Sequence, residues 1–244
     1  VLSKGHPVRN VISALSLAAL LCGQLVYSAY ATTQDDVALG ERLATLLRAG
    51  RSVISNHQDL LNDPSRGDKG FDGDRMVEEA AALFAERRGE EPVSEDLSER
   101  DRRLINAQIA AMDEVIDEHK SQIDIEGMGF KGFIPALFGR LVNERFAEKV
   151  GDEARIKVTA PIELVLNRNA RPDDWETEVI ETRFRAADWP RGEAYTEEVD
   201  VDGRAAFRML LPEYYSSSCL SCHGGPAGEL DITGYPKEGA GEGD

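Results

Sequence analysis

The chain has 244 residues, of which 41% are hydrophobic and 30% charged, and its formal net charge is −17. This length and apolar content are enough for one large domain or two modest ones, each with a core. The acidic balance argues against nucleic acid and anionic membrane surfaces as partners, because both are polyanions.

Residues 1–31 have the features of a signal peptide. Lys4 and Arg9 give a positive start, an apolar run follows from Val11 to Val26, and Ala29-Tyr30-Ala31 has the small-x-small pattern of a cleavage site. The apolar run is short for a spanning helix, so the membrane is expected as a partner only through an uncleaved form of this segment. We therefore expect an exported, periplasmic protein of bacterial type.

Residues 32–150 are expected to be helical. Apolar side chains recur there at three- and four-residue intervals, with charged residues between them. Gly89 and Gly151 are typical helix ends, and the charged connector from Gly89 to Arg103 offers Ser94 or Ser98 as an N-cap. The predicted helices cover 38–61, 76–88, 104–123 and 134–150.

The helical part contains an internal repeat. An offset of 62 residues superposes His57 on His119, and the G-x-K-G-F loop of residues 67–71 on residues 129–133. We interpret this as a duplicated helix–loop–helix unit forming a pseudo-symmetric four-helix arrangement. The first unit and its connector span 32–103, and the second spans 104–151.

The remainder, 152–244, changes to strand-like alternation. The candidate strands are 156–159, 178–185, 197–201 and 205–211, whereas 167–174 is expected to be a loop. Asp202-Gly203 between the last two predicts a hairpin. The expected fold class is α+β, with the helical repeat packed on a small antiparallel sheet domain.

The segment Cys219-Leu220-Ser221-Cys222-His223 reads C-x-x-C-H, the attachment signature of a c-type haem. The two thiols would each bond one haem vinyl group, and His223 would be the proximal iron ligand. Zinc needs four ligands, and the chain offers no second C-x-x-C pair. A thioredoxin-like redox pair normally lies at the start of a helix, and Gly224-Gly225-Pro226 disfavours a helix here. A structural disulfide between the two cysteines would leave His223 without a role. Export therefore favours one covalent haem c.

The opposite iron ligand has several candidates. His119 is the first choice and its repeat counterpart His57 the alternative; a histidine gives a lower potential than a methionine. A methionine ligand, or none, also stays open, the methionines being Met76, Met112, Met128 and Met209.

Other residues are candidates for the haem pocket. An arginine suits a propionate because its planar fork matches a carboxylate. Aromatic side chains suit the walls. The arginine candidates are Arg140, Arg145 and Arg208, and the wall candidates are Phe133, Tyr214 and Tyr215.

Several motifs together resemble a known family. Lys131–Ala136, Lys157–Pro161 and Leu211–Tyr215 precede Cys219–Gly224, and Asp231–Pro236 follows it. The chain from about Ala110 to Asp244 resembles the exported single-haem c-type cytochromes with a PAS-like haem domain, formerly a domain of unknown function.

This resemblance implies covalent attachment at Cys219 and Cys222, proximal ligation by His223, and a PAS-like haem domain over 152–244. In the structurally known type the other ligand is a cysteine on a helix before the sheet, which this chain lacks, since Cys22 leaves with the signal. Family members also continue into a further strand, so we expect a truncated C-terminus.

The expected function is one-electron transfer to a periplasmic redox partner. The alternative is a haem-based redox or gas sensor with a signalling partner. No Ser/His/Asp order, P-loop or H-E-x-x-H motif occurs in the sequence, so an enzymatic role such as peroxidase ranks third.

Overall fold

The computed structural model describes residues 12–165, 167–201 and 203–244. The fold is α+β, with helices that dominate the first part and one antiparallel hairpin in the second. The longer helices and the strands are α1 (Ile12–Asn56), α3 (Gly73–Arg88), α4 (Glu99–Ile123), α5 (Pro135–Val150), α6 (Asp174–Val179), β1 (Tyr195–Val201) and β2 (Arg204–Leu210). The short helices are α2 (Gln58–Leu61), η1 (Gly151–Glu153), η2 (Ile162–Leu164), η3 (Arg168–Ala170), η4 (Ile180–Phe184), η5 (Ser217–Cys219) and α7 (Leu220–His223).

The predicted helix ends are confirmed by the groups that cap them. Ser98 begins α4, its hydroxyl accepting a bond of 3.1 Å from the amide of Asp101. Gly89 ends α3 with φ +71°, and Gly151 ends α5 with φ +62°. This left-handed backbone explains the glycine at both ends.

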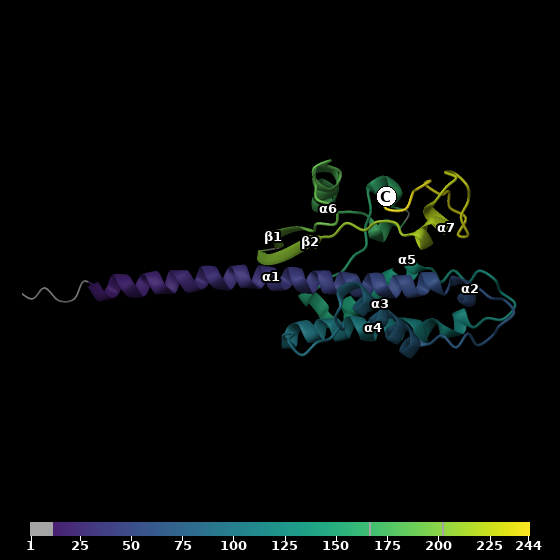
Figure 1. Ribbon diagram of the computed structural model, residues 1–244, viewed down its shortest axis with the longest axis horizontal. Coiled ribbons are helices and arrows are strands. Elements are labelled where there is room, and N and C mark those ends of the chain that lie inside the picture. The colour runs from purple at the N-terminus through teal and green to yellow at the C-terminus, as the bar shows by residue number, and fades with distance from the viewer. Residues whose placement is uncertain (1–11, 166, 202) are drawn as a thin grey trace, which may run out of the picture.

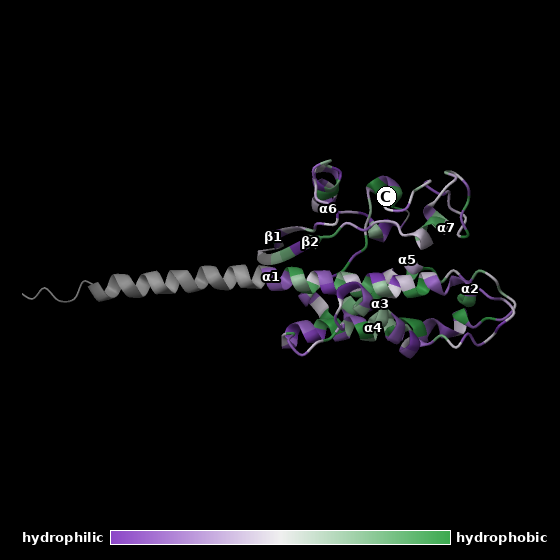
Figure 2. Cartoon of the chain, viewed as in Figure 1, coloured by the Kyte–Doolittle hydropathy of each residue, from purple (hydrophilic) through white to green (hydrophobic). Residues whose placement is uncertain are grey.

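Helices α1, α3, α4 and α5 form one bundle around the main core. α1 packs on α3 and α5, and α4 packs on α5 and α3, so each helix packs on its partner within the repeat and on a helix of the other repeat. Figure 2 shows apolar residues, in green, alternating with hydrophilic ones along these helices, as expected of helices with one buried face. The largest fully buried apolar side chains are Leu46, Ile54, Leu61, Phe71, Met76, Phe84, Ile105, Met112, Phe133, Phe138 and Phe146.

The two G-x-K-G-F loops brace each other across the bundle. The amide of Lys69 donates to Asp124 Oδ1 at 2.9 Å, and the amide of Lys131 donates to Asn62 Oδ1 at 3.0 Å. Asn62 and Asp124 are themselves related by the repeat offset, as are the two lysines. The two hydrogen bonds are therefore equivalent under the repeat offset.

Both loop lysines are buried at this junction. Lys69 is 0% exposed and Lys131 is 5% exposed. Their ammonium groups donate to backbone carbonyls, Lys69 to Asp63 and Arg66, and Lys131 to Leu61 at 2.9 Å. The long side chains thus satisfy carbonyls that the loops would otherwise bury without a partner.

The predicted strand over 178–185 is wrong. Asp173 and Glu176 form a capping box with reciprocal bonds of 2.8 Å, which begins α6 and leads into the π-helical turn η4. Val179 and Ile180 are buried as neighbours on this helix. The capping box was readable in the sequence and outweighs the apparent alternation. The candidate strand at 156–159 also has no strand pairing.

The predicted hairpin is confirmed. β1 pairs antiparallel with β2, from Tyr195 opposite Leu210 to Val201 opposite Arg204. Gly203 takes φ +79° in the turn, and Asp202 lies outside the described residues. Within the described ranges these are the only two strands.

The hairpin, α6 and α7 lie on the side of α1 that faces away from α4 (Figure 1). Contacts join α1 to β2 and to η5. Helix α1 therefore lies between α4, which carries the predicted iron ligand His119, and the C-x-x-C-H motif on η5 and α7.

Part of the predicted signal peptide, residues 1–11, lies outside the described residues, and the rest belongs to α1. A search of the described part of the chain finds no helix with the length and apolar character needed to span a membrane.

The buried lysine pair generates a prediction about pH. Burial and the adjacent Lys69 charge lower the pKa of Lys131 below its ordinary 10.5. The folded state thus disfavours the protonated form, and this penalty disappears as pH rises through the lowered pKa towards the unfolded value. The difference in the free energy of unfolding between the wild type and Lys131→Met should therefore shift in favour of the wild type as the pH rises through the interval just below 10.5.

Urea unfolding at a series of pH values measures this difference. Lys149→Met is the matched control, because that ammonium pairs with Glu114 near the surface. An unchanged difference between wild type and Lys131→Met across the series would contradict the prediction.

Candidate functional site

The C-x-x-C-H motif occupies one tight helical turn. Cys219 ends η5 and Cys222 lies in α7, so the two thiols are one turn apart. Both are free and partly exposed, which does not support the disulfide reading. Gly224 ends the turn where a Cβ would lie 2.5 Å from the carbonyl oxygen of Leu220, so only glycine fits there.

His223 is held by a carboxylate and an aromatic ring. Its Nδ1 lies 2.9 Å from Glu238 Oε2, and its ring stacks on Tyr215 with centroids 4.8 Å apart and an angle of 25°. The ionised carboxylate of Glu238 can only accept, so Nδ1 of His223 donates to it. The imidazole side chain is 41% exposed.

The C-terminal segment folds back over the motif. The amide of Ala240 donates to the carbonyl of His223 at 2.8 Å, the amide of Gly243 to that of Tyr215 at 2.8 Å, and the amide of Tyr215 to that of Asp244 at 3.0 Å. This tail is rich in glycine. The structure makes it the support of the two rings.

Tyr215 is partly buried in a negative environment. Burial is the main cause that raises the pKa of its phenol, and the charges of Glu238, Cys219 and Glu213 raise it further. The phenol is therefore neutral at physiological pH and acts as a ring packed on the imidazole.

The segment before the motif is bound to the bundle by two arginines of α1. Arg48 Nη2 donates to the carbonyl of Pro212 at 2.9 Å, and Arg51 Nη1 donates to both carboxylate oxygens of Glu213 at 2.7 Å. These bonds fix where η5 and α7 lie relative to α1. We call this contact the arginine seam, formed by Arg48 and Arg51 of α1, Arg87 of α3, and Pro212 and Glu213.

A family model described as Tll0287-like matches residues 90–244, which is more than half of the chain. The chain belongs to the Tll0287-like family. The match begins in the connector before α4 and includes the whole motif and its tail, while most of the first repeat lies outside it. No curated protein and no solved structure matches the chain. The family assignment agrees with the resemblance seen in the sequence, and it carries no information about a cofactor.

Of the predicted wall residues, only the tyrosines are near the motif in this Tll0287-like chain. Tyr215 stacks on His223, whereas the adjacent Tyr214 ring lies 3.8 Å below the guanidinium of Arg191 and its hydroxyl accepts from the amide of Gly192. Phe133 is 1% exposed in the bundle core, where its contacts are His119 and Phe138.

The arginines predicted to bind propionates already have carboxylate partners. Arg140 bonds Glu144 within α5 at 2.8 Å. Arg208 bonds Asp173 at 2.7 Å and covers the Trp175 ring. Arg145 bonds three carboxylates, Glu114, Glu118 and Glu148.

The two predicted histidine ligands have equivalent structural positions in the repeat. The His57 ring lies 5.1 Å from Phe71, and the His119 ring lies 5.3 Å from Phe133. His57 Nε2 is 2.6 Å from Glu79, and His119 Nδ1 bonds the Val115 carbonyl at 2.8 Å. Within the described residues neither imidazole contacts 219–223. Each packs against the phenylalanine of its own loop, and iron ligation by either one stays a prediction.

The methionines also lie away from the motif or in the core. Met76 and Met112 are buried against Gly50 of α1, and the end of Met209 rests on Gly40. Met128 is 46% exposed in the second loop. Across the described ranges, no group of three or more His, Cys, Asp or Glu side chains is arranged to hold a metal ion.

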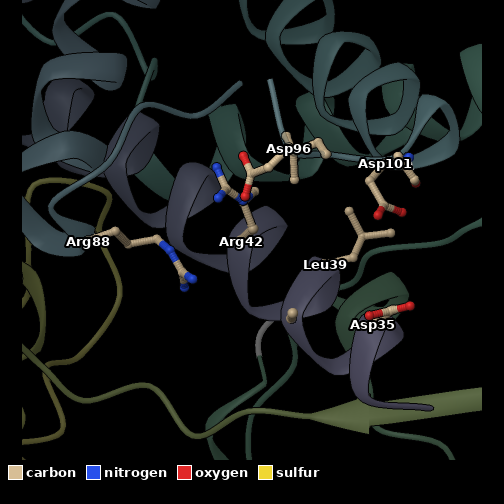
Figure 3. Close-up of a pocket in the computed structure, with 9 residues that line it drawn as sticks. Asp35, Leu39, Arg42, Arg88, Asp96 and Asp101 are labelled. Atoms are coloured by element: carbon tan, nitrogen blue, oxygen red, sulfur yellow. Dashed lines mark hydrogen bonds between the residues drawn. The ribbon is translucent and has the colours of Figure 1, made fainter. Parts of the chain in front are cut away.

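A cavity of about 300 Å³ lies elsewhere, where α1, the end of α3 and the start of α4 meet the connector. Figure 3 shows the Arg42 guanidinium there, turned toward Asp96. Arg42 bonds the carbonyls of Glu91 and Pro92 and the carboxylate of Glu90, so it fastens the connector to α1. The cavity is a by-product of this attachment and does not touch the C-x-x-C-H motif.

The support of the motif by its tail is testable in haem-free protein. Removing residues 239–244 breaks the three backbone hydrogen bonds to Tyr215 and His223. At about 1 kcal/mol each, their loss should make Cys219 and Cys222 react with a maleimide about tenfold faster or more, because local opening costs less. Denatured samples of both proteins should react at equal rates, and equal rates when native would contradict the role of the tail.

Proposed function

We propose that this protein is an exported monohaem c-type cytochrome that transfers single electrons. One haem is attached through thioethers to Cys219 and Cys222, and His223 is the proximal ligand. When bound, the haem iron supplies a centre that accepts and releases one electron. The proposal is carried by two free thiols one helical turn apart, followed at once by a 41% exposed imidazole that contacts Glu238 through Nδ1.

The surroundings of His223 fit this role. An imidazole that ligates a metal usually donates its other nitrogen's proton to a carboxylate or carbonyl, which fixes the tautomer and raises the basicity of the ligating nitrogen. Glu238 is placed to do this at 2.9 Å. Tyr215 holds the plane of the ring from one face, and the tail bonds hold Tyr215. These groups prepare the imidazole before any cofactor binds.

The remaining parts of the proposal follow from the sequence. We infer that 152–244 is the PAS-like haem domain, with the hairpin and α6 as its main elements here. His119, or His57 in its place, is proposed as the opposite ligand, and either imidazole must leave its phenylalanine to serve. The acidic surface is suited to a basic periplasmic redox partner.

Haem attachment is tested with the full chain expressed in a host that matures c-type cytochromes. The wild type should give the pyridine haemochrome spectrum of haem c, because both vinyl groups become thioethers. The double variant Cys219→Ala/Cys222→Ala should retain no covalent haem, and His223→Ala should lose the low-spin spectrum. Ser216→Ala and Ser218→Ala are matched neighbours that should retain haem. A wild type without a Soret band would refute the proposal.

A haem-based sensor is the second candidate, and the arginine seam favours it. The seam joins the haem-bearing segment directly to α1 and so offers a physical link from the cofactor to the bundle. Carbon monoxide added to the reduced protein separates the two functions. Electron transfer predicts a six-coordinate iron and an unchanged spectrum, whereas a sensor predicts fast binding and a change in the helical far-ultraviolet signal.

A further inference from the structure

The arginine seam brings three guanidinium groups to the segment that leads into the motif. Arg48 and Arg51 come from α1, and Arg87 comes from α3 and donates to Ser52 at 2.8 Å. Gly139 of α5 makes room for Arg51, because a Cβ there would lie 3.0 Å from its Cδ. In a chain with a net charge of −17, this concentration of positive charge is unusual.

The positive charges of the seam are not matched by carboxylates. Among the described residues only Glu213 is placed to neutralise them, and its two oxygens are bound to Arg51. Arg48 has a neutral carbonyl as its acceptor, and burial followed by the Arg51 and Arg87 charges lowers its pKa despite Glu213. An uncompensated guanidinium in a partly buried place is costly, so a further carboxylate would stabilise it.

A second observation concerns Arg51 itself. Its Nε is buried and has no hydrogen-bond partner. The guanidinium therefore uses Nη1 for Glu213 and leaves a donor unused, although an arginine fork can hold a carboxylate through two nitrogens. This nitrogen lies against Gly139 of α5, 3.6 Å from where a Cβ would stand, so Arg51 can offer a further acceptor only its outer nitrogens.

We propose that the seam binds the propionate carboxylates of the haem, with Arg48, which bonds a carbonyl rather than a carboxylate, as the principal donor and Arg51 and Arg87 as further positive charges. This inference rests on the proposed attachment at Cys219 and Cys222. It replaces Arg140, Arg145 and Arg208, whose guanidiniums are already paired with carboxylates. All three are therefore poor candidates for a further anion.

The net charge of the chain and the covalent attachment of the haem indicate where the carboxylate comes from. The chain repels free anions because its net charge is −17. A carboxylate on a group bonded to Cys219 is delivered within the molecule, where its effective concentration is high. Glu213 precedes Cys219 by one short segment, and η5 contacts α1 directly. The seam is thus within the same local structure as the attachment site.

The experiment measures the midpoint potential of the haem-loaded full chain as a function of pH, in wild type, Arg48→Gln, Arg51→Gln and Arg140→Gln. Losing a positive charge beside the propionates destabilises the reduced iron, so both seam variants should have a lower potential at neutral pH. The propionate titration seen in the potential should also move up by about one pH unit or more. Arg140→Gln is the matched control and should behave as wild type.

Arg48→Lys and Arg51→Lys guard against a loss of folding, since they keep the charge and should give intermediate shifts. Unchanged potentials and titrations in the seam variants, with haem c still attached, would overturn this inference and leave the haem proposal intact. A shifted midpoint potential in Arg140→Gln alone would indicate that the propionates bind at α5, and would overturn this inference. Stabilisation of the haem-loaded wild type by inorganic phosphate that Arg48→Gln abolishes would show a seam still open to free anions, and would also overturn it.

Discussion

The two copies of the helix–loop–helix unit depend on each other through an exchange of hydrogen bonds between their loops. Asn62 accepts from the Lys131 amide and Asp124 from the Lys69 amide, so neither loop is complete without the other copy. The two lysines then carry their charge into the interior to satisfy backbone carbonyls. This is an expensive solution, because a buried ammonium loses its hydration. It is tolerated because buried carbonyls without donors would cost a comparable amount.

The rigid bundle that results presents α1 to the second part of the chain. Arg48 and Arg51 extend from that helix to Pro212 and Glu213, while the tail holds Tyr215 and His223 from the other side. The motif is therefore fixed at both ends by contacts distant in sequence. A cofactor attached there would meet an imidazole already oriented by Glu238 and a local excess of positive charge. That combination is consistent with a prosthetic group that carries carboxylates.

Local signals predicted much of this structure. Glycines at positions 89 and 151, Ser98, and the Asp202-Gly203 turn marked real boundaries, because each acts through its own backbone or nearest neighbours. The strand expected over 178–185 is absent because the capping box at Asp173 commits the segment to a helix despite its alternation. The repeat was readable because duplication leaves a constant offset.

The tertiary contacts could not be predicted from the sequence. Nothing local indicates that Glu238 contacts His223, or that Arg48 bonds Pro212, since these pairs form only when distant segments fold together. The choice of His119 relied on its place in the repeat. The structure shows that this same place gives it a packing role against Phe133 that His57 repeats against Phe71.

The central claim is that Cys219 and Cys222 together bind one haem. Mass spectrometry of the proteolytic peptide that contains residues 219–223, from protein matured in a haem-competent host, tests it most directly. One haem should stay covalently bound to this peptide after denaturation, with both thiols blocked to alkylation. A peptide of unmodified mass with two alkylatable thiols would contradict it.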